Sequence, residues 1–162
     1  MLSKKMEEAL NKQVNAEMFS SYLYLAMAVD FEAKNFGGFA KWLEVQSKEE
    51  MGHAMKFVKH IQDRRGRVTL AAIAEPPAEW DTPLAAFQAV LGHEKKITGL
   101  VNGLVELAAK EKDNATGVAL QWFVTEQVEE EKNADLIVEQ LKKIGDSFHG
   151  LMMLNSVLGQ RS

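Results

Sequence analysis

All three prolines of the 162-residue chain lie in one short segment, at Pro76, Pro77 and Pro83. Proline breaks a helix because it lacks the amide hydrogen and its ring clashes with the preceding turn. The chain on either side of this segment is therefore free to form long, uninterrupted helices. This feature favours an all-α fold in which the helices on the two sides are joined by a single structured connection.

Four long stretches carry apolar residues at alternating steps of three and four, which is the spacing of a stripe along one face of a helix. Residues typical of helix ends border them: Ser3 precedes the first, Gly66 follows the second, and Asp81-Thr82-Pro83 begins the third. We predict long helices over residues 4–35, 38–65, 83–111 and 115–145, and a short apolar fifth helix over residues 147–158.

The connection between the second and third helices, residues 67–82, has no helical pattern, and Glu75-Pro76-Pro77 forces an extended course. About sixteen residues can span roughly 50 Å, whereas a helix of about 28 residues is roughly 42 Å long. The connection can therefore run the length of a bundle and begin the third helix at the same end as the second. We expect the apolar residues among 68–73 to lie on the bundle. The predicted fold is a ferritin-like four-helix bundle with one long crossover and a short C-terminal fifth helix.

Each long helix has one polar interruption near the middle of its apolar stripe. The interruptions are Glu17, Glu50 with His53, Glu94, and Gln127 with Glu130. Because antiparallel helices bring their midpoints to one height, these side chains are expected to meet inside the bundle. Buried like charges cannot all ionise unless a cation compensates them. The pattern therefore predicts a metal site of four glutamates and one histidine.

The types of ligand narrow the identity of the metal. Glu50 and His53 lie three residues apart, so they point to the same side of a helix and can share one ion. Oxygen ligands with a single imidazole suit iron or manganese, although zinc would also bind. The absence of cysteine excludes a disulfide framework, a zinc ribbon and an iron–sulfur centre. The suggested chemistry is the oxidation of two Fe(II) ions by O2 or peroxide.

Composition excludes other classes of function. The net charge of −4 and the lack of a basic run argue against a nucleic-acid-binding protein. No segment approaches an uninterrupted membrane span, and the first eight residues lack the apolar stretch of a secretory signal. We expect one domain spanning residues 1–162, located in the cytoplasm. The run from Met18 to Val29 is apolar nearly all round, so we expect a second subunit to cover it.

The chain resembles a prokaryotic non-haem ferritin, from Asn15-Ala16-Glu17 through Glu50 and His53 to the acidic run 126–131. The ferritin-like di-iron class in general uses two lone glutamates and two Glu-x-x-His motifs. Here the second motif reads Gln127-x-x-Glu130. That departure separates the chain from bacterioferritins and rubrerythrins and is similar to the ferritin subgroup.

The resemblance implies roles for particular residues. The first iron would be held by Glu17, Glu50 and His53, and the second by Glu94 and Glu130, with Glu50 bridging and Gln127 hydrogen-bonded beside them. A third iron site would use Glu49, Glu126 and Glu129, and Tyr24 matches a tyrosine that can hydrogen-bond a ligand or donate an electron. The resemblance also implies a ferroxidase and iron store, built as a hollow shell of twenty-four identical subunits around a ferric mineral.

Several alternatives remain open. Met51 stands where bacterioferritins carry a haem-binding methionine, but methionine is common in helical cores and the second Glu-x-x-His is missing. A di-iron oxidase or peroxidase that stores nothing would need an apolar substrate pocket, which the sequence does not reveal. A purely structural bundle is disfavoured because its acids would share one height by accident. Tyr24 could also be a packing residue, and the three glutamates of the third site a plain acidic surface.

Overall fold

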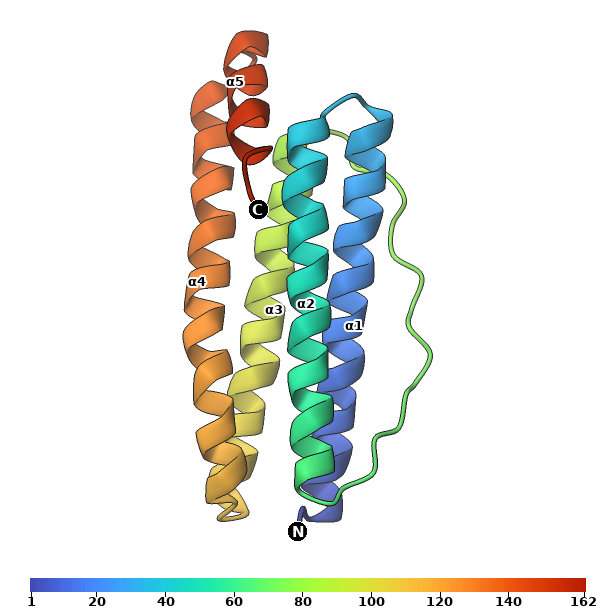
Figure 1. The fold of residues 1–162 in the computed structure, drawn as a ribbon. Helices are drawn as coiled ribbons and strands as arrows, with labels where there is room; N and C mark the ends of the chain where they lie inside the picture. The colour runs from blue at the N-terminus through green and yellow to red at the C-terminus, as the bar shows by residue number, and fades with distance from the viewer.

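The structure, a computed structural model, describes all 162 residues and contains five helices and no strand. They are α1 (Lys4–Ala33), α2 (Gly37–Asp63), α3 (Pro83–Lys110), α4 (Asn114–Ile144) and α5 (Phe148–Leu158). The four long helices form a bundle, and α5 lies at one end of it (Figure 1). The predicted all-α fold is confirmed, and every predicted boundary lies within two residues of the observed one. None of the helices is both long and apolar enough to cross a membrane.

Side-chain caps begin four of the five helices. Ser3, Thr82, Asp113 and Ser147 each accept a hydrogen bond from the backbone N–H three residues further on. Such caps satisfy amides that have no partner within the helix. Pro83 occupies the first turn of α3, where its missing N–H has no consequence.

The beginning of α2 is capped from elsewhere in the chain. Asn35 adopts a left-handed conformation with φ of 63°, which turns the chain from α1 into α2. The backbone N–H groups of Gly38 and Phe39 then donate to Oδ1 of Asn155, at 2.9 and 3.1 Å. Asn155 belongs to α5, so this cap also fastens the last helix to the bundle.

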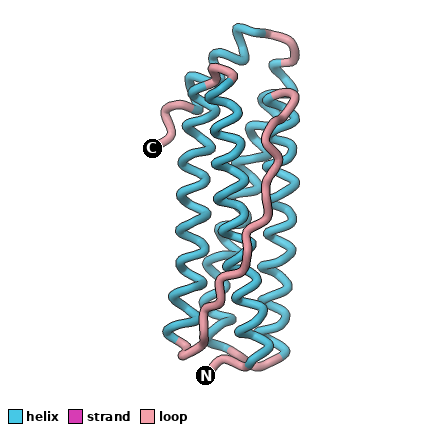
Figure 2. Tube along the Cα trace, turned by 90° about the vertical axis from the view of Figure 1, so that its right-hand side faces the viewer, coloured by secondary structure: helices cyan, strands magenta, loops and turns pink.

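The connection between α2 and α3 runs along the outside of α1 over the length of the bundle (Figures 1 and 2). Two asparagines of α1 hold it in place. Asn11 accepts the backbone N–H of Thr69 at 2.7 Å, and Asn15 donates to the carbonyl of Ala72 at 3.1 Å. The predicted long crossover is therefore confirmed, and α3 begins at the same end of the bundle as α2.

Two details of this connection differ from the expectation. Val68 packs against the core, but Leu70 and Ile73 are 67% and 39% exposed, because polar bonds rather than apolar contacts hold the segment. The residue that turns the chain at the end of α2 is Arg65, with φ of 59°, and not Gly66. Gly66 lies in close contact with its surroundings. A Cβ there would lie 2.9 Å from side-chain atoms of Leu2, Glu7 and Ile61, so these side chains would have to shift.

The apolar core consists of two clusters, one toward each end of the bundle. One includes the stacked rings of Phe31 and Phe39, whose centroids are 5.1 Å apart. The other includes Phe57 and Phe123, stacked at 3.9 Å. Buried polar side chains separate the two clusters at mid-height. That layer contains the residues singled out from the sequence.

Candidate metal centre

All four long helices contribute to a buried polar layer in the middle of the bundle. Its acidic, imidazole and amide groups are Glu17 from α1, Glu50 and His53 from α2, Glu94 from α3, and Gln127 and Glu130 from α4. None of the six is more than 5% exposed. The structure thus brings together the polar interruptions that the sequence places at one height.

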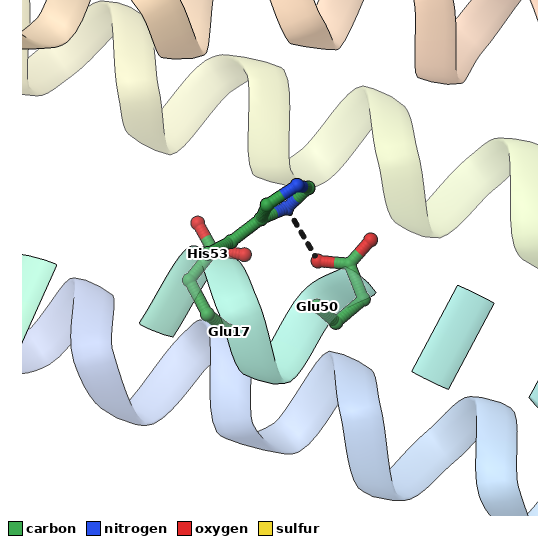
Figure 3. Close-up of side chains that lie close together, drawn as sticks. All are labelled: Glu17, Glu50 and His53. Carbon is green, nitrogen blue, oxygen red and sulfur yellow. Dashed lines mark hydrogen bonds and ion pairs between the residues drawn. The ribbon is translucent and has the colours of Figure 1, made fainter. Parts of the chain in front are cut away.

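Two groups of potential ligands overlap at Glu50. Oxygen or nitrogen atoms of Glu17, Glu50 and His53 lie within 4.8 Å of one another, and so do oxygens of Glu50, Glu94 and Glu130. Figure 3 shows Glu17 rising from α1 toward Glu50 and His53 of α2, with His53 Nδ1 at 3.2 Å from Glu50 Oε2. Because Glu50 has a place in both groups, its carboxylate can bridge two ions.

Two glutamines that the sequence reasoning missed orient these carboxylates. Gln13 donates to Glu17 Oε1 at 2.7 Å. Gln46 donates from one Nε2 to Glu50 Oε1 at 3.1 Å and to Glu130 Oε2 at 2.7 Å. Gln13 and Gln46 each lie four residues, about one helical turn, before the glutamate of their own helix. That spacing was the signal that could have revealed them.

Glu94 is held by donors from two other helices. The hydroxyl group of Tyr24 donates to Glu94 Oε1, and Gln127 donates to Oε2 at 3.1 Å. Burial and the nearby carboxylates raise the pKa of Tyr24 well above its ordinary value, so its hydroxyl group remains a donor. Tyr24 is fully buried among the core side chains, so it both packs and hydrogen-bonds.

Burial makes the carboxyl groups weak acids. Desolvation, followed by the charge of Glu50, raises the pKa of Glu17 to about 8. Desolvation, followed by the charge of Glu94, raises that of Glu130 to about 7, and desolvation also raises the pKa values of Glu50 and Glu94. Glu17 Oε2 has no hydrogen-bond partner at all. An unpaired buried oxygen is unfavourable, and a cation bound there would satisfy it.

The residues predicted for a third metal position are not gathered in the same way. Glu126 approaches His53, with Oε1 at 3.9 Å from Nε2, and these two form a third potential ligand group with Glu130. Glu49 is instead paired with Arg161 at 2.5 Å. Glu129 is exposed and belongs to none of the three groups.

Proteins of known family are similar in sequence to this bundle. The family profile of the ferritin-like domain matches residues 7–144. The chain belongs to the ferritin family. This ferritin is 47% identical over 161 residues to the bacterial non-haem ferritin of Bacteroides fragilis, covering 99% of this chain and 100% of that protein. It is 36% identical over 162 residues to the bacterial non-haem ferritin of Staphylococcus aureus, covering 100% of this chain and 98% of that protein.

A solved structure agrees with this ferritin over the whole chain. The open pore ferritin from the hyperthermophilic archaeon Archaeoglobus fulgidus is 50% identical to it, with a TM-score of 0.99 and coverage of 100% of both chains. The resemblance to a prokaryotic non-haem ferritin and the predicted ferritin fold are therefore confirmed.

Proposed function

We propose that this ferritin oxidises Fe(II) at its buried polar layer and stores the ferric product. The observation that carries the proposal is the pair of ligand groups that share Glu50, in a chain that matches non-haem ferritins over its full length. Iron is here both the substrate and the stored material. Two Fe(II) ions supply one electron each. One O2 with two protons becomes H2O2, or one H2O2 with two protons becomes two water molecules.

In this proposal, Glu17, Glu50 and His53 bind one Fe(II) ion, and Glu94 and Glu130 bind the other, with Glu50 between them. The distances within the two ligand groups support this division. The raised pKa values of Glu17 and Glu130 mean that these carboxyl groups hold protons near neutral pH until a cation binds. Binding of Fe(II) then releases protons, because ligands must be deprotonated.

Gln127 and Tyr24 act through Glu94 in the same proposal. Both donate hydrogen bonds to its carboxylate, so they fix the direction in which its oxygens face the metals. Oriented second-layer donors commonly tune metal affinity and activity. We further propose that Glu49, Glu126 and Glu129 form a third position for iron, which the approach of Glu126 to His53 supports.

Assembly into a shell of twenty-four copies is part of the proposal. The single chain exposes apolar side chains on α1, where Tyr22, Leu25 and Val29 are 48%, 45% and 63% exposed. On α5, Phe148 and Val157 are 73% and 60% exposed. Large exposed apolar patches typically mark contacts between proteins. Size-exclusion chromatography with light scattering is expected to show a particle of shell size, and a monomer or dimer would contradict the assembly.

A pocket next to the layer bears on the rival function of a non-storing oxidase. Its volume is 360 Å³, and it is lined by apolar groups that include Phe57, Trp122 and Phe123. Trp122 and Phe123 pack edge-on against His53, at centroid distances of 5.3 and 6.3 Å. None of the six residues of the buried layer lines this pocket. An organic substrate bound there would be separated from the metals by the two rings, which favours iron itself as the substrate.

Stopped-flow absorbance after mixing with Fe(II) in air tests the site. Glu50→Ala and His53→Ala are expected to lose the fast oxidation phase, while the matched variant Glu44→Ala on an exposed face of α2 keeps it. If both site variants oxidise iron as fast as the parent protein, the assignment is wrong. Aerobic addition of many irons per subunit tests storage. Soluble ferric product in a particle of shell size supports it, whereas precipitation points to the rival.

A further inference from the structure

The C-terminal end of the chain returns from α5 toward α2 (Figure 1). There the guanidinium group of Arg161 lies over the ring of Trp42, with its carbon 4.3 Å from the ring centroid. One nitrogen donates to the carbonyl of Trp42 at 3.2 Å and to Gln46 Oε1 at 2.9 Å. The other donates to Glu49 Oε2 at 2.5 Å. The penultimate residue of the chain thus has four contacts on one face of α2.

These contacts fix the amide of Gln46. A guanidinium group has only donors, so the amide must turn its oxygen toward Arg161. Its nitrogen then faces the other way, toward Glu50 and Glu130, where it donates to both carboxylates. Arg161 is therefore connected to the buried layer through one side chain.

The contact with Glu49 has a different consequence. Glu49 is 45% exposed, and its carboxylate already has a cation, because the Arg161 side chain, 22% exposed, is directly paired with it. A metal ion bound to that carboxylate would lie close to the guanidinium group, and the two positive charges would repel each other. The ion pair with Arg161 therefore competes with the binding of metal at Glu49.

We propose that Arg161 is a positioning residue that serves as the tethered counter-cation of Glu49 and is displaced when a metal ion binds there. The inference rests on the proposed function, because Glu49 matters to iron handling only if iron passes beside the buried layer. Arg161 then lowers the affinity for metal of the position at Glu49, relative to that of the buried centre. It also keeps Glu49 paired while no metal is bound.

The emission of Trp42 in the assembled parent protein reports the displacement directly. Titration with Zn²⁺ is expected to change this emission after the buried centre has filled, because the guanidinium group leaves the ring. Trp42→Phe keeps the other two tryptophans, Trp80 and Trp122, and is expected to lose only this late change. Identical late changes in both proteins would overturn the proposal.

Calorimetric titration with Zn²⁺ measures the competition. Arg161→Gln is expected to raise the Zn²⁺ affinity of the weaker sites, those that include Glu49, about fivefold. This is the upper range for the loss of a partly exposed ion pair. The gain is expected to vanish in the double variant with Glu49→Gln. Lys59→Gln, which removes an exposed cation from the same helix, is expected to bind Zn²⁺ like the parent.

The outcomes separate this inference from the proposed function. If Arg161→Gln has the isotherm of the parent, or if its gain persists without Glu49, the role of Arg161 is refuted while the buried centre stands. If the parent protein has no tight class of sites that Glu50→Ala removes, the proposed function itself fails.

Discussion

Replacing Glu17 by glutamine is expected to stabilise the metal-free protein at neutral pH. The side chain is 1% exposed, its Oε2 has no partner, and its pKa is raised from 4.5 to about 8. Well below pH 4.5 the carboxyl group is protonated in both the folded and the unfolded chain, so its ionisation does not contribute to stability. Between pH 4.5 and about 8 only the unfolded chain releases the proton, so rising pH favours unfolding. Glutamine removes this titration and still has an oxygen to accept from Gln13.

The size of the effect follows from the pKa. Each pH unit above the ordinary pKa destabilises the fold by about 1.4 kcal/mol until the folded-state pKa is reached. At pH 7 the Glu17 carboxyl group therefore destabilises the metal-free fold by about 3 kcal/mol, and Glu17→Gln should recover most of it. Metal narrows the difference: Zn²⁺ at about a hundred times its dissociation constant stabilises the parent by about 2.7 kcal/mol, and the variant by less.

Guanidinium unfolding of chelator-treated protein, followed by circular dichroism at pH 5 and pH 7, measures the difference. One protein concentration is used throughout, because dissociation of an assembly also shifts the midpoint. Glu44→Gln, on an exposed face of α2, is the matched control and should show no pH-dependent gain. The reasoning would be refuted if Glu17→Gln were less stable than the parent at pH 7. It would also be refuted if the gain in unfolding free energy over the parent were the same at pH 5 and pH 7.

Three further changes test separate parts of the structure. Gly38→Ala should detach α5 and lower the unfolding midpoint, because the new Cβ would lie 1.6 Å from the carbonyl oxygen of Asn155; Gly52→Ala, with nothing within 4 Å, should not. Glu129→Ala should alter iron turnover while equilibrium dialysis finds the buried centre fully occupied; loss of that occupancy would contradict the assignment. Tyr24→Phe loses the hydrogen bond to Glu94, worth about 1 kcal/mol, and should slow oxidation at low Fe(II) concentration about fivefold in stopped flow. An unchanged rate would mean that this tyrosine only packs.

The parts of the fold that the sequence predicted are those governed by local chemistry and regular spacing. Helix ends such as Thr82-Pro83 have capping residues that act within one turn, and the midpoint glutamates share a height because the helices are of similar length. The prediction that Leu70 and Ile73 lie on the bundle was wrong, because both side chains are exposed. The path of the crossover is set instead by hydrogen bonds between its backbone and asparagine side chains of α1. Those partners lie more than fifty residues away in sequence.

The candidate site divides in the same manner. Glu50 and His53 belong to one turn of one helix, so their spacing alone indicates a shared role. Gln46 is one turn away from Glu50, yet it also contacts Glu130, which belongs to another helix. Arg161 is 112 residues from its partner Glu49, and only folding of the C-terminal end onto α2 brings them together. Long-range contacts of this kind have no periodic pattern in the sequence.

The arrangement of the helices means that bound metal ions would join two separate halves of the bundle. α1 packs chiefly against α2, and α3 against α4, so the bundle consists of two helical hairpins. One hairpin carries Glu17, Glu50 and His53, and the other carries Glu94 and Glu130. Without metal, the carboxyl groups face one another across the boundary between the hairpins. Ions bound by ligands from both hairpins would connect the two hairpins. A metal-free subunit should therefore open first where its two hairpins meet.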